Sequence, residues 1–394
     1  MNRKEKFLRN AERLDLNLWV TMIFIICYGL VMIYSASVYK IDPEKGVTAI
    51  YYVRRQAIFA VAGLCVAGFV QNVITPDWLY KYSEWIYLIG VLATVLLHWI
   101  GSEKYGAKRW IRVGPVTIQV AEIVKIGVII MIAACLKKSQ EERMVYKLRL
   151  YWGAGFIPAI LVMWLSKDLG SGLIIAGIAF VMTFIYTDTD KYHAILLALV
   201  LTGGAIFVFY VKKTLPPEAL IHTSGHRHVY KRIAAWLNKD GYLRTVSSQL
   251  RESQYAISRG GFFGCGLGRS IQKLGRIPEV HTDMILAVVG EELGVCGLAL
   301  YVFLILYMVD VILRMAYREE DLFMRVVDVG VGTHIFLQAL INMAVVFGVI
   351  PNTGITAPFM SYGGSSLVLF MGEVGLVLCG EKRRYRREIK KQTL

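Results

Sequence analysis

The stretch RGGFFGCGLGRSIQKLGRIPEVHTDMILAVVGEELGVCGLALYVFLILYM, residues 259–308, decides the fold. It opens as a basic, glycine-rich segment, passes through Pro278 and Glu279, and turns at Asp283 into an apolar run. Glycine and proline interrupt regular helices, whereas an apolar run of this length is typical of a membrane-spanning helix. The stretch therefore predicts an extramembrane loop that leads into the end of a transmembrane helix, with the Asp283 carboxylate at the junction.

The whole chain has the composition of an integral membrane protein. Of its 394 residues, 56% are hydrophobic and 19% are charged. A bilayer core about 30 Å thick requires roughly 20 apolar residues per helix. We predict an all-α polytopic membrane protein that forms one domain over residues 1–394. Ten transmembrane helices are predicted at 17–37, 56–74, 84–100, 119–136, 150–165, 170–187, 193–211, 284–309, 326–350 and 365–380.

The positions of lysine and arginine predict the orientation of these helices. Basic residues gather in the tail 1–15, in the connections 137–149 and 314–325, and in the tail 381–394. Cytoplasmic loops of membrane proteins are enriched in lysine and arginine, so these segments and both termini are predicted to be cytoplasmic. The long segment 212–282, between the seventh and eighth helices, is then one extracytoplasmic loop, and a basic amphipathic pattern around Trp236 predicts an interfacial helix within it.

Several functions are excluded or weakened by the same composition. The net charge of +15 is explained by the orientation of the helices in the membrane, so it does not indicate a nucleic-acid partner. The six cysteines show no paired spacing, so neither a disulfide frame nor a metal site is predicted. The glycine-rich run lacks the Gly-Lys-Ser/Thr spacing of a nucleotide-binding loop. Two interpretations of it remain: a flexible connector, or a cradle in which backbone N–H groups with Arg259, Arg269 and Lys273 hold a lipid phosphate.

Basic residues also persist on the predicted outer side, against the orientation bias. Arg54 and Arg55 follow two tyrosines at a membrane boundary, where snorkelling side chains are common. A role as ligand-binding cations is the alternative interpretation. The next outer loop adds a similar set, namely Lys108, Arg109, Trp110 and Arg112.

Polar residues interrupt two of the apolar regions. Glu122 and Lys125 lie three residues apart, hence on one helical face, and form either a buried pair or the lining of a polar cavity. Asp168 is predicted to cap the sixth span. The segment 351–366, which contains Ser361 and Gly363, holds two prolines and three glycines, so a re-entrant or capping loop is predicted there.

Asp283 is the strongest candidate for chemistry. Glu279, His281 and Asp283 gather within five residues beside basic groups. A carboxylate in this setting can act as general base toward a hydroxyl nucleophile. The competing interpretation makes Thr282 an N-cap and Asp283 a first-turn residue that favours the helix dipole. His281 alone is weak evidence for a metal ligand.

Four ordered motifs together resemble the SEDS family (shape, elongation, division and sporulation) of bacterial cell-wall polymerases. They are GAKRWIRVG (106–114), KDLGSG (167–172), SRGGFFGCGLGRSIQKLGRIPEVHTDMILAVVGEELG (258–294) and PNTGITAPFMSYGGSSL (351–367). The likeness covers nearly the whole chain and is greater to the FtsW and SpoVE branch than to the RodA branch. Residues 119–122 read Gln-Val-Ala-Glu where the family usually has Gln-Pro-Ser-Glu, which leaves the start of that helix in question.

The resemblance implies a ten-helix peptidoglycan glycosyltransferase of the bacterial cytoplasmic (inner) membrane. Such an enzyme polymerises lipid II, the undecaprenyl-pyrophosphate-linked disaccharide peptide, on the extracytoplasmic face during septal cell-wall synthesis. It works with a class B penicillin-binding protein transpeptidase and other divisome proteins. No cofactor is assigned, and a divalent cation is left open. The alternatives are a lipid II flippase, a non-enzymatic scaffold, or the same chemistry in elongation or sporulation.

The resemblance also implies roles for individual residues. The family's essential carboxylate falls on Asp283, and the buried Glu and Lys of its fourth helix fall on Glu122 and Lys125. A pyrophosphate leaving group needs cations. The candidates for this role are Arg54, Arg55, Lys108, Arg109, Arg112, Arg259 and Arg269, and the predicted substrate-binding set is completed by Trp110, Glu279, His281, Ser361 and Gly363.

Overall fold

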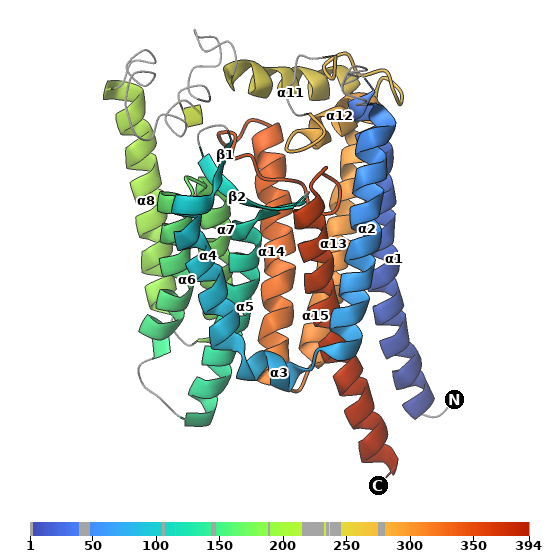
Figure 1. The fold of residues 1–394 in the computed structure, drawn as a ribbon, viewed down its shortest axis with the longest axis vertical. Coiled ribbons are helices and arrows are strands. Elements are labelled where there is room, and N and C mark those ends of the chain that lie inside the picture. The colour runs from blue at the N-terminus through green and yellow to red at the C-terminus, as the bar shows by residue number, and fades with distance from the viewer. Residues whose placement is uncertain are drawn as a thin grey trace.

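The structure is a helical bundle with both termini at one end (Figure 1). It is a computed structural model and describes residues 3–38, 48–104, 107–114, 116–142, 147–187, 190–214, 232–233, 236, 246–274 and 280–393. We call the end with the termini the inner end. The opposite end, which carries α11 (Val246–Gly260) and the short helix α12 (Ile285–Glu292), is the outer end.

The predicted all-α membrane fold is confirmed. Six helices of the described chain are long and apolar enough to cross a membrane. They lie in α1 (Arg3–Ser37), α2 (Ala49–Val73), α7 (Leu169–Tyr186), α13 (Gly294–Arg318), α14 (Leu322–Val346) and α15 (Gly364–Thr393). The other long helices are α4 (Ser83–Ile100), α5 (Val120–Glu142), α6 (Lys147–Leu165) and α8 (Asp190–Thr214), and a short helix, α3 (Pro76–Lys81), lies at the inner end.

The predicted eighth span, 284–309, is wrong as a continuous helix. The structure divides it into α12, whose residues are all buried, and α13. The break falls at Gly294, whose φ of +66° lies in the left-handed region that glycine adopts without steric cost. The capping interpretation of Thr282 is also wrong, because the N-cap of α12 is Met284 and no side chain caps it.

A small β-sheet lies at the outer part of the bundle, where the sequence predicted only a loop (Figure 1). Strands β1 (Ser102–Lys104), β2 (Ala107–Val113) and β3 (Val116–Gln119) form an antiparallel meander in the order β1-β2-β3. Trp110 pairs with Gln119, directly before α5 begins. The sheet therefore fixes the basic β2 strand to the start of the helix that carries Glu122.

Two segments predicted as loops lie at the outer end, and the second of them contains a helix, α11, that was not predicted. The chain between α14 and α15 contains no helix from Phe347 to Gly363, as the prolines and glycines indicate. Within the long loop 212–282, α11 lies across the outer end of the bundle. Of the predicted interfacial helix only Arg232, Ile233 and Trp236 belong to the described residues, and all three have helical backbone.

Candidate functional site

Asp283 lies in the turn that leads into α12, and α14 holds this turn in place. The side-chain amide Nδ2 of Asn342 donates to the carbonyl oxygen of Asp283 at 2.8 Å and to that of Ile355 at 2.7 Å. Thr282 Oγ1 donates to Asp283 Oδ1 at 3.2 Å. Because Asn342 is fully buried, it joins the Asp283 turn and the 347–363 loop into one unit.

The surroundings of Asp283 suit a proton acceptor. Burial raises the pKa of its carboxyl above the ordinary value, while hydrogen bonds from its own backbone N–H and from Thr282, and the charge of Arg232, act in the opposite direction. A general base is most effective when its pKa approaches the working pH. Arg232, which sequence reasoning missed, is thus the charged neighbour of the candidate base.

A second guanidinium group, that of Arg109, approaches Arg232, the charged neighbour of Asp283. A Cβ added at Gly354 would lie 3.5 Å from Arg109 Nη1 and 3.6 Å from Arg232 Nη2. Arg109 Nη2 donates to the carbonyl oxygen of Lys167 at 2.9 Å, and its Nε lies 3.7 Å from Asp168 Oδ2. Burial lowers the pKa of Arg232, and the neighbouring Arg109 charge adds to that shift. Such a pair of cations has a physical preference for an anion between them.

Asp168 anchors one side of this site. Its carboxylate accepts from the backbone N–H of Ser171 at 3.2 Å and from Ser171 Oγ at 3.0 Å. These contacts confirm Asp168 as the N-cap of α7. Since Asp168 also faces Arg109, the helix cap orients a cation of the site.

A small cavity of about 40 Å³ lies between the two arginines and the 347–363 loop. This is room for a few ordered water molecules. Thr353 Oγ1, on its wall, is buried and has no hydrogen-bond partner in the described structure. The lining residues are Arg109, Lys167, Leu169, Arg232, Ile233, Pro351, Asn352 and Thr353.

His281 belongs to an aromatic cluster at the outer end of α2. Its ring centroid lies 4.6 Å from that of Tyr52 and 5.2 Å from that of Tyr362. The backbone N–H of Tyr362 donates to the His281 carbonyl oxygen at 2.9 Å. Arg55 donates to the hydroxyl of Tyr51 at 3.2 Å. Packing thus brings His281 and Arg55 to the same region, and a role of either residue toward a ligand stays a prediction.

Ser361 and Gly363 are fixed through their backbones by one side chain of α2. Gln56 Nε2 donates to the Ser361 carbonyl oxygen at 3.1 Å, and the Gly363 N–H donates to Gln56 Oε1 at 3.2 Å. Ser361 Oγ accepts from the Ala357 N–H at 2.8 Å. These contacts hold the loop, and a role of either residue toward a ligand stays a prediction.

Glu122 and Lys125 form a buried pair. Lys125 Nζ lies 2.7 Å from Glu122 Oε1 and donates to Gln338 Oε1 at 2.7 Å. The two residues are 3% and 0% exposed, so the structure supports the paired interpretation rather than an open cavity lining. Sequence reasoning missed His334 and Glu373, which extend this network into α14 and α15.

The glycine-rich run 260–266 packs against the break between α12 and α13 and forms backbone hydrogen bonds with both helices. The N–H groups of Cys265 and Gly266 donate to the carbonyls of Glu291 and Glu292 at the end of α12. The carbonyls of Gly261 and Phe262 accept from the first N–H groups of α13, those of Val295 and Cys296. Backbones approach so closely here that a Cβ at Gly264 would lie 2.1 Å from the carbonyl oxygen of Glu292.

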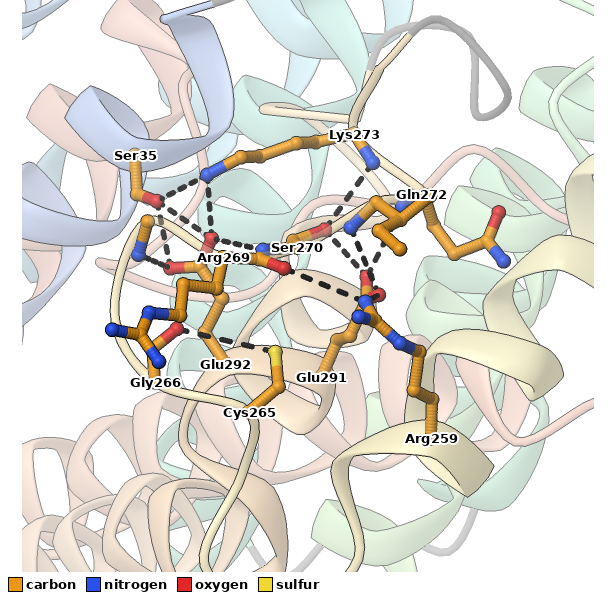
Figure 2. Close-up of polar contacts among 12 residues, drawn as sticks. Ser35, Arg259, Cys265, Gly266, Arg269, Ser270, Gln272, Lys273, Glu291 and Glu292 are labelled. Carbon is orange, nitrogen blue, oxygen red and sulfur yellow. Dashed lines mark hydrogen bonds and ion pairs between the residues drawn. The ribbon is translucent and has the colours of Figure 1, made fainter.

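Most donors of the predicted phosphate cradle have partners within the chain. The N–H groups of Cys265 and Gly266 bind backbone carbonyls, and the side chains of Arg259 and Lys273 bind carboxylates (Figure 2). A role of Arg269 toward a phosphate stays a prediction. Glu291 accepts from Arg259 Nη1 at 2.6 Å and from the N–H groups of Ile271 and Gln272. Glu292 receives a second set of donors, Lys273 Nζ at 2.6 Å, Ser35 Oγ, and the N–H groups of Gly268 and Ser270. Buried carboxylates require such donors. These contacts fix residues 259–273 against the end of α12, which gives the segment a structural role.

The remaining predicted site residues are Arg54, Lys108, Trp110, Arg112, Arg269 and Glu279. Arg54, Arg112 and Arg269 are exposed, whereas Lys108 and Trp110 are half-buried on β2. Glu279 lies outside the described residues. A role of these residues in substrate binding stays a prediction.

The fold and the site together define a polytopic helical membrane protein with a carboxylate and two arginines beside a cavity at its outer end. The chain belongs to the FtsW, RodA and SpoVE family of cell cycle proteins, whose model matches residues 15–385. It is 34% identical to the probable peptidoglycan glycosyltransferase FtsW of Bacillus subtilis over 92% of this chain and 89% of that protein. It is 33% identical to the stage V sporulation protein E of the same organism, over 92% and 96% of the two chains.

Solved structures have the same fold. One is described as "Structural coordination of polymerization and crosslinking by a peptidoglycan synthase complex", with a TM-score of 0.74, 25% identity, and coverage of 94% of this chain and 98% of that chain. The rod shape determining protein RodA of Thermus thermophilus has a TM-score of 0.64 and 24% identity, over 93% and 96% of the two chains. The latter likeness shows the fold alone.

Proposed function

We propose that this protein is a peptidoglycan glycosyltransferase that polymerises lipid II, with Asp283 as general base. The observation that carries this proposal is the position of the Asp283 carboxylate at the outer end of the bundle, with Arg232 beside it and Arg109 converging on Arg232. Relatives over nearly the full chain length are named probable peptidoglycan glycosyltransferases. A base beside cations suits a reaction with a hydroxyl nucleophile and an anionic leaving group.

The reaction joins two lipid II molecules. The 4-hydroxyl of one N-acetylglucosamine attacks the anomeric carbon of the other molecule's N-acetylmuramic acid, and the bond from that carbon to undecaprenyl pyrophosphate breaks. Asp283 accepts the hydroxyl proton as the new bond forms. Arg109 and Arg232 stabilise the negative charge that develops on the departing pyrophosphate.

A lipid II flippase is the rival function, because ionisable groups buried within a membrane bundle, here Glu122, Lys125, His334 and Glu373, also occur in transporters. An assay in detergent micelles distinguishes the two functions, because micelles have no two compartments between which lipid II could be transported. We expect the purified protein to convert lipid II into glycan strands there, detected by gel electrophoresis. Unchanged lipid II under every tested condition, together with transport in vesicles, would support the flippase.

We place the site on the extracytoplasmic face of the bacterial cytoplasmic membrane, as the distribution of lysine and arginine indicates. Cys265 reports on this because it lies in the outer loop and is partly exposed. A membrane-impermeant maleimide is expected to label Cys265 in intact spheroplasts, and a Cys265→Ser variant serves as control. Labelling only after membrane disruption would contradict the orientation.

The proposed partner is a class B penicillin-binding protein transpeptidase, since a structural relative is part of a peptidoglycan synthase complex. A division role is proposed from the FtsW relatives, and depletion that produces filaments, rather than round cells or defective spores, would test it. The divalent cation that the sequence leaves open has no ligand group of three or more His, Cys, Asp or Glu among the described residues, and we assign it no step.

Replacing Arg232 with glutamine is expected to move the acid limb of the polymerisation rate to higher pH. The Arg232 charge lowers the pKa of Asp283, so its removal raises that pKa and delays formation of the carboxylate as pH rises. The pH dependence of kcat/KM measures this shift. Arg251→Gln, at an exposed site on α11, is the control. If the acid limb stays at the same pH or moves to lower pH, the proposed action of Arg232 on the Asp283 carboxyl is contradicted.

A further inference from the structure

A buried histidine and a buried glutamate face each other between α14 and α15. His334 Nδ1 lies 2.9 Å from both carboxylate oxygens of Glu373. The two residues are 0% and 1% exposed, and the ring of Phe370 stacks on the imidazole at 4.8 Å. Neither residue belongs to the site around Asp283, and the proposed reaction does not use them.

The hydrogen bonds around the imidazole determine how many protons this pair holds. Lys125 Nζ, which can only donate, lies 2.7 Å from Gln338 Oε1, so this atom of Gln338 is an acceptor. His334 Nε2 lies 3.1 Å from the same oxygen and must therefore carry a proton. With that proton on Nε2, a neutral imidazole has only a lone pair at Nδ1, and a lone pair facing an ionised carboxylate would be repelled.

Two protonation states satisfy this geometry. Either Nδ1 also carries a proton, which makes His334 an imidazolium against a carboxylate, or Glu373 is protonated and donates to Nδ1. Both states hold one proton more than a neutral histidine beside an ionised glutamate.

The charge balance of the region requires the same proton. Among the described residues, the charged groups that face the pair from α5 are Glu122 and Lys125, with Glu122 Oε2 3.8 Å from His334 Nε2. Their charges cancel, so the cluster is neutral only when the His334–Glu373 pair holds the additional proton. An uncompensated charge at such depth in a membrane protein is costly.

We propose that His334 and Glu373 form an intramembrane proton-binding site that is occupied in the folded protein at neutral pH. This goes beyond the proposed function and does not depend on it. The site is joined to the outer loop, because Gln338 Nε2 donates to the Thr356 carbonyl oxygen at 3.3 Å. The proton-binding site is therefore in hydrogen-bond contact, through Gln338, with the 347–363 loop, and another part of that loop lines the cavity at the outer end.

Spectroscopy of the purified protein without substrate tests whether the proton is present. If Glu373 holds it, the infrared spectrum at pH 7 contains a protonated carboxyl band that Glu373→Gln removes. If His334 holds it, ¹⁵N spectra of histidine-labelled protein, assigned with His334→Gln, show both ring nitrogens protonated. The absence of both signals would overturn the proposal.

Stability as a function of pH gives a second test. The folded pair binds more protons than the unfolded chain near neutral pH, so the thermal unfolding midpoint falls as pH rises through the titration of the pair. Glutamine at position 373 cannot ionise, so Glu373→Gln is expected to lack this alkaline fall in either protonation state of the native pair. Where Glu373 holds the proton, the variant also matches the native midpoint at pH 7. Asp310→Asn, at a side chain 46% exposed, should retain the fall. Parallel curves for native and Glu373→Gln proteins would contradict the site.

Discussion

Asp283→Asn is expected to lower the rate of lipid II polymerisation by about 10²–10⁴-fold, the usual loss when a general base is removed. Asparagine has nearly the same shape but cannot accept the hydroxyl proton. The turn itself should persist, because Asn342 binds the backbone carbonyl of residue 283 rather than its side chain. The initial rate of glycan formation by the purified variant measures the effect.

Two controls separate chemistry from folding in this experiment. The variant should insert into the membrane and show a native thermal unfolding midpoint. Thr282→Val removes the hydroxyl that donates to Asp283 Oδ1 at 3.2 Å and should cost far less activity, because the carboxylate remains. Undiminished polymerisation by Asp283→Asn would refute its role as the base.

Gly264→Ala is expected to prevent stable folding of the outer end. Its φ is +82°, and the added Cβ would lie 2.1 Å from the carbonyl oxygen of Glu292. Overpacking typically costs about 1–3 kcal/mol and sometimes more, and the left-handed conformation adds roughly 1–2 kcal/mol for a residue with a side chain. The thermal unfolding midpoint and the yield of monodisperse protein measure the loss.

Gly268→Ala is the matched control for that substitution. Gly268 has nearly the same φ, +81°, but a Cβ there meets nothing within 4 Å. The control therefore carries the backbone strain without the collision. Equal destabilisation by the two substitutions would show that close packing against α12 is unimportant.

Hydropathy predicted most of the fold because lipid selects long apolar helices. Hydropathy did not separate α12 from α13 in the predicted eighth span. The buried helix α12 is as apolar as a membrane helix, and α13 begins two residues after it ends. The signal was the adjacent pair Glu291 and Glu292, which a lipid-facing helix would not tolerate, followed by Gly294. The β-meander was missed because its strands are short and the central one, β2, is rich in basic residues.

The site was predictable where local sequence carries chemistry. Asp283 and Arg109 stood out as charges at membrane boundaries, and the structure places both at the outer end beside Arg232. Arg232 itself was missed because it lies in a long loop whose basic pattern indicates only an interfacial helix. His334 and Glu373 are single polar residues 39 positions apart, and only the packing of α14 on α15 brings them together.

Incubation of the purified protein with lipid II, with and without a class B penicillin-binding protein, followed by measurement of glycan chain length, tests the central claim most directly. We predict strands of many disaccharide units with release of undecaprenyl pyrophosphate, and formation of strands about 10²–10⁴-fold more slowly by the Asp283→Asn protein. If lipid II stays monomeric with every partner tested, or if the Asp283→Asn protein makes strands of the same length at the same rate, the assignment of this carboxylate to sugar polymerisation is contradicted.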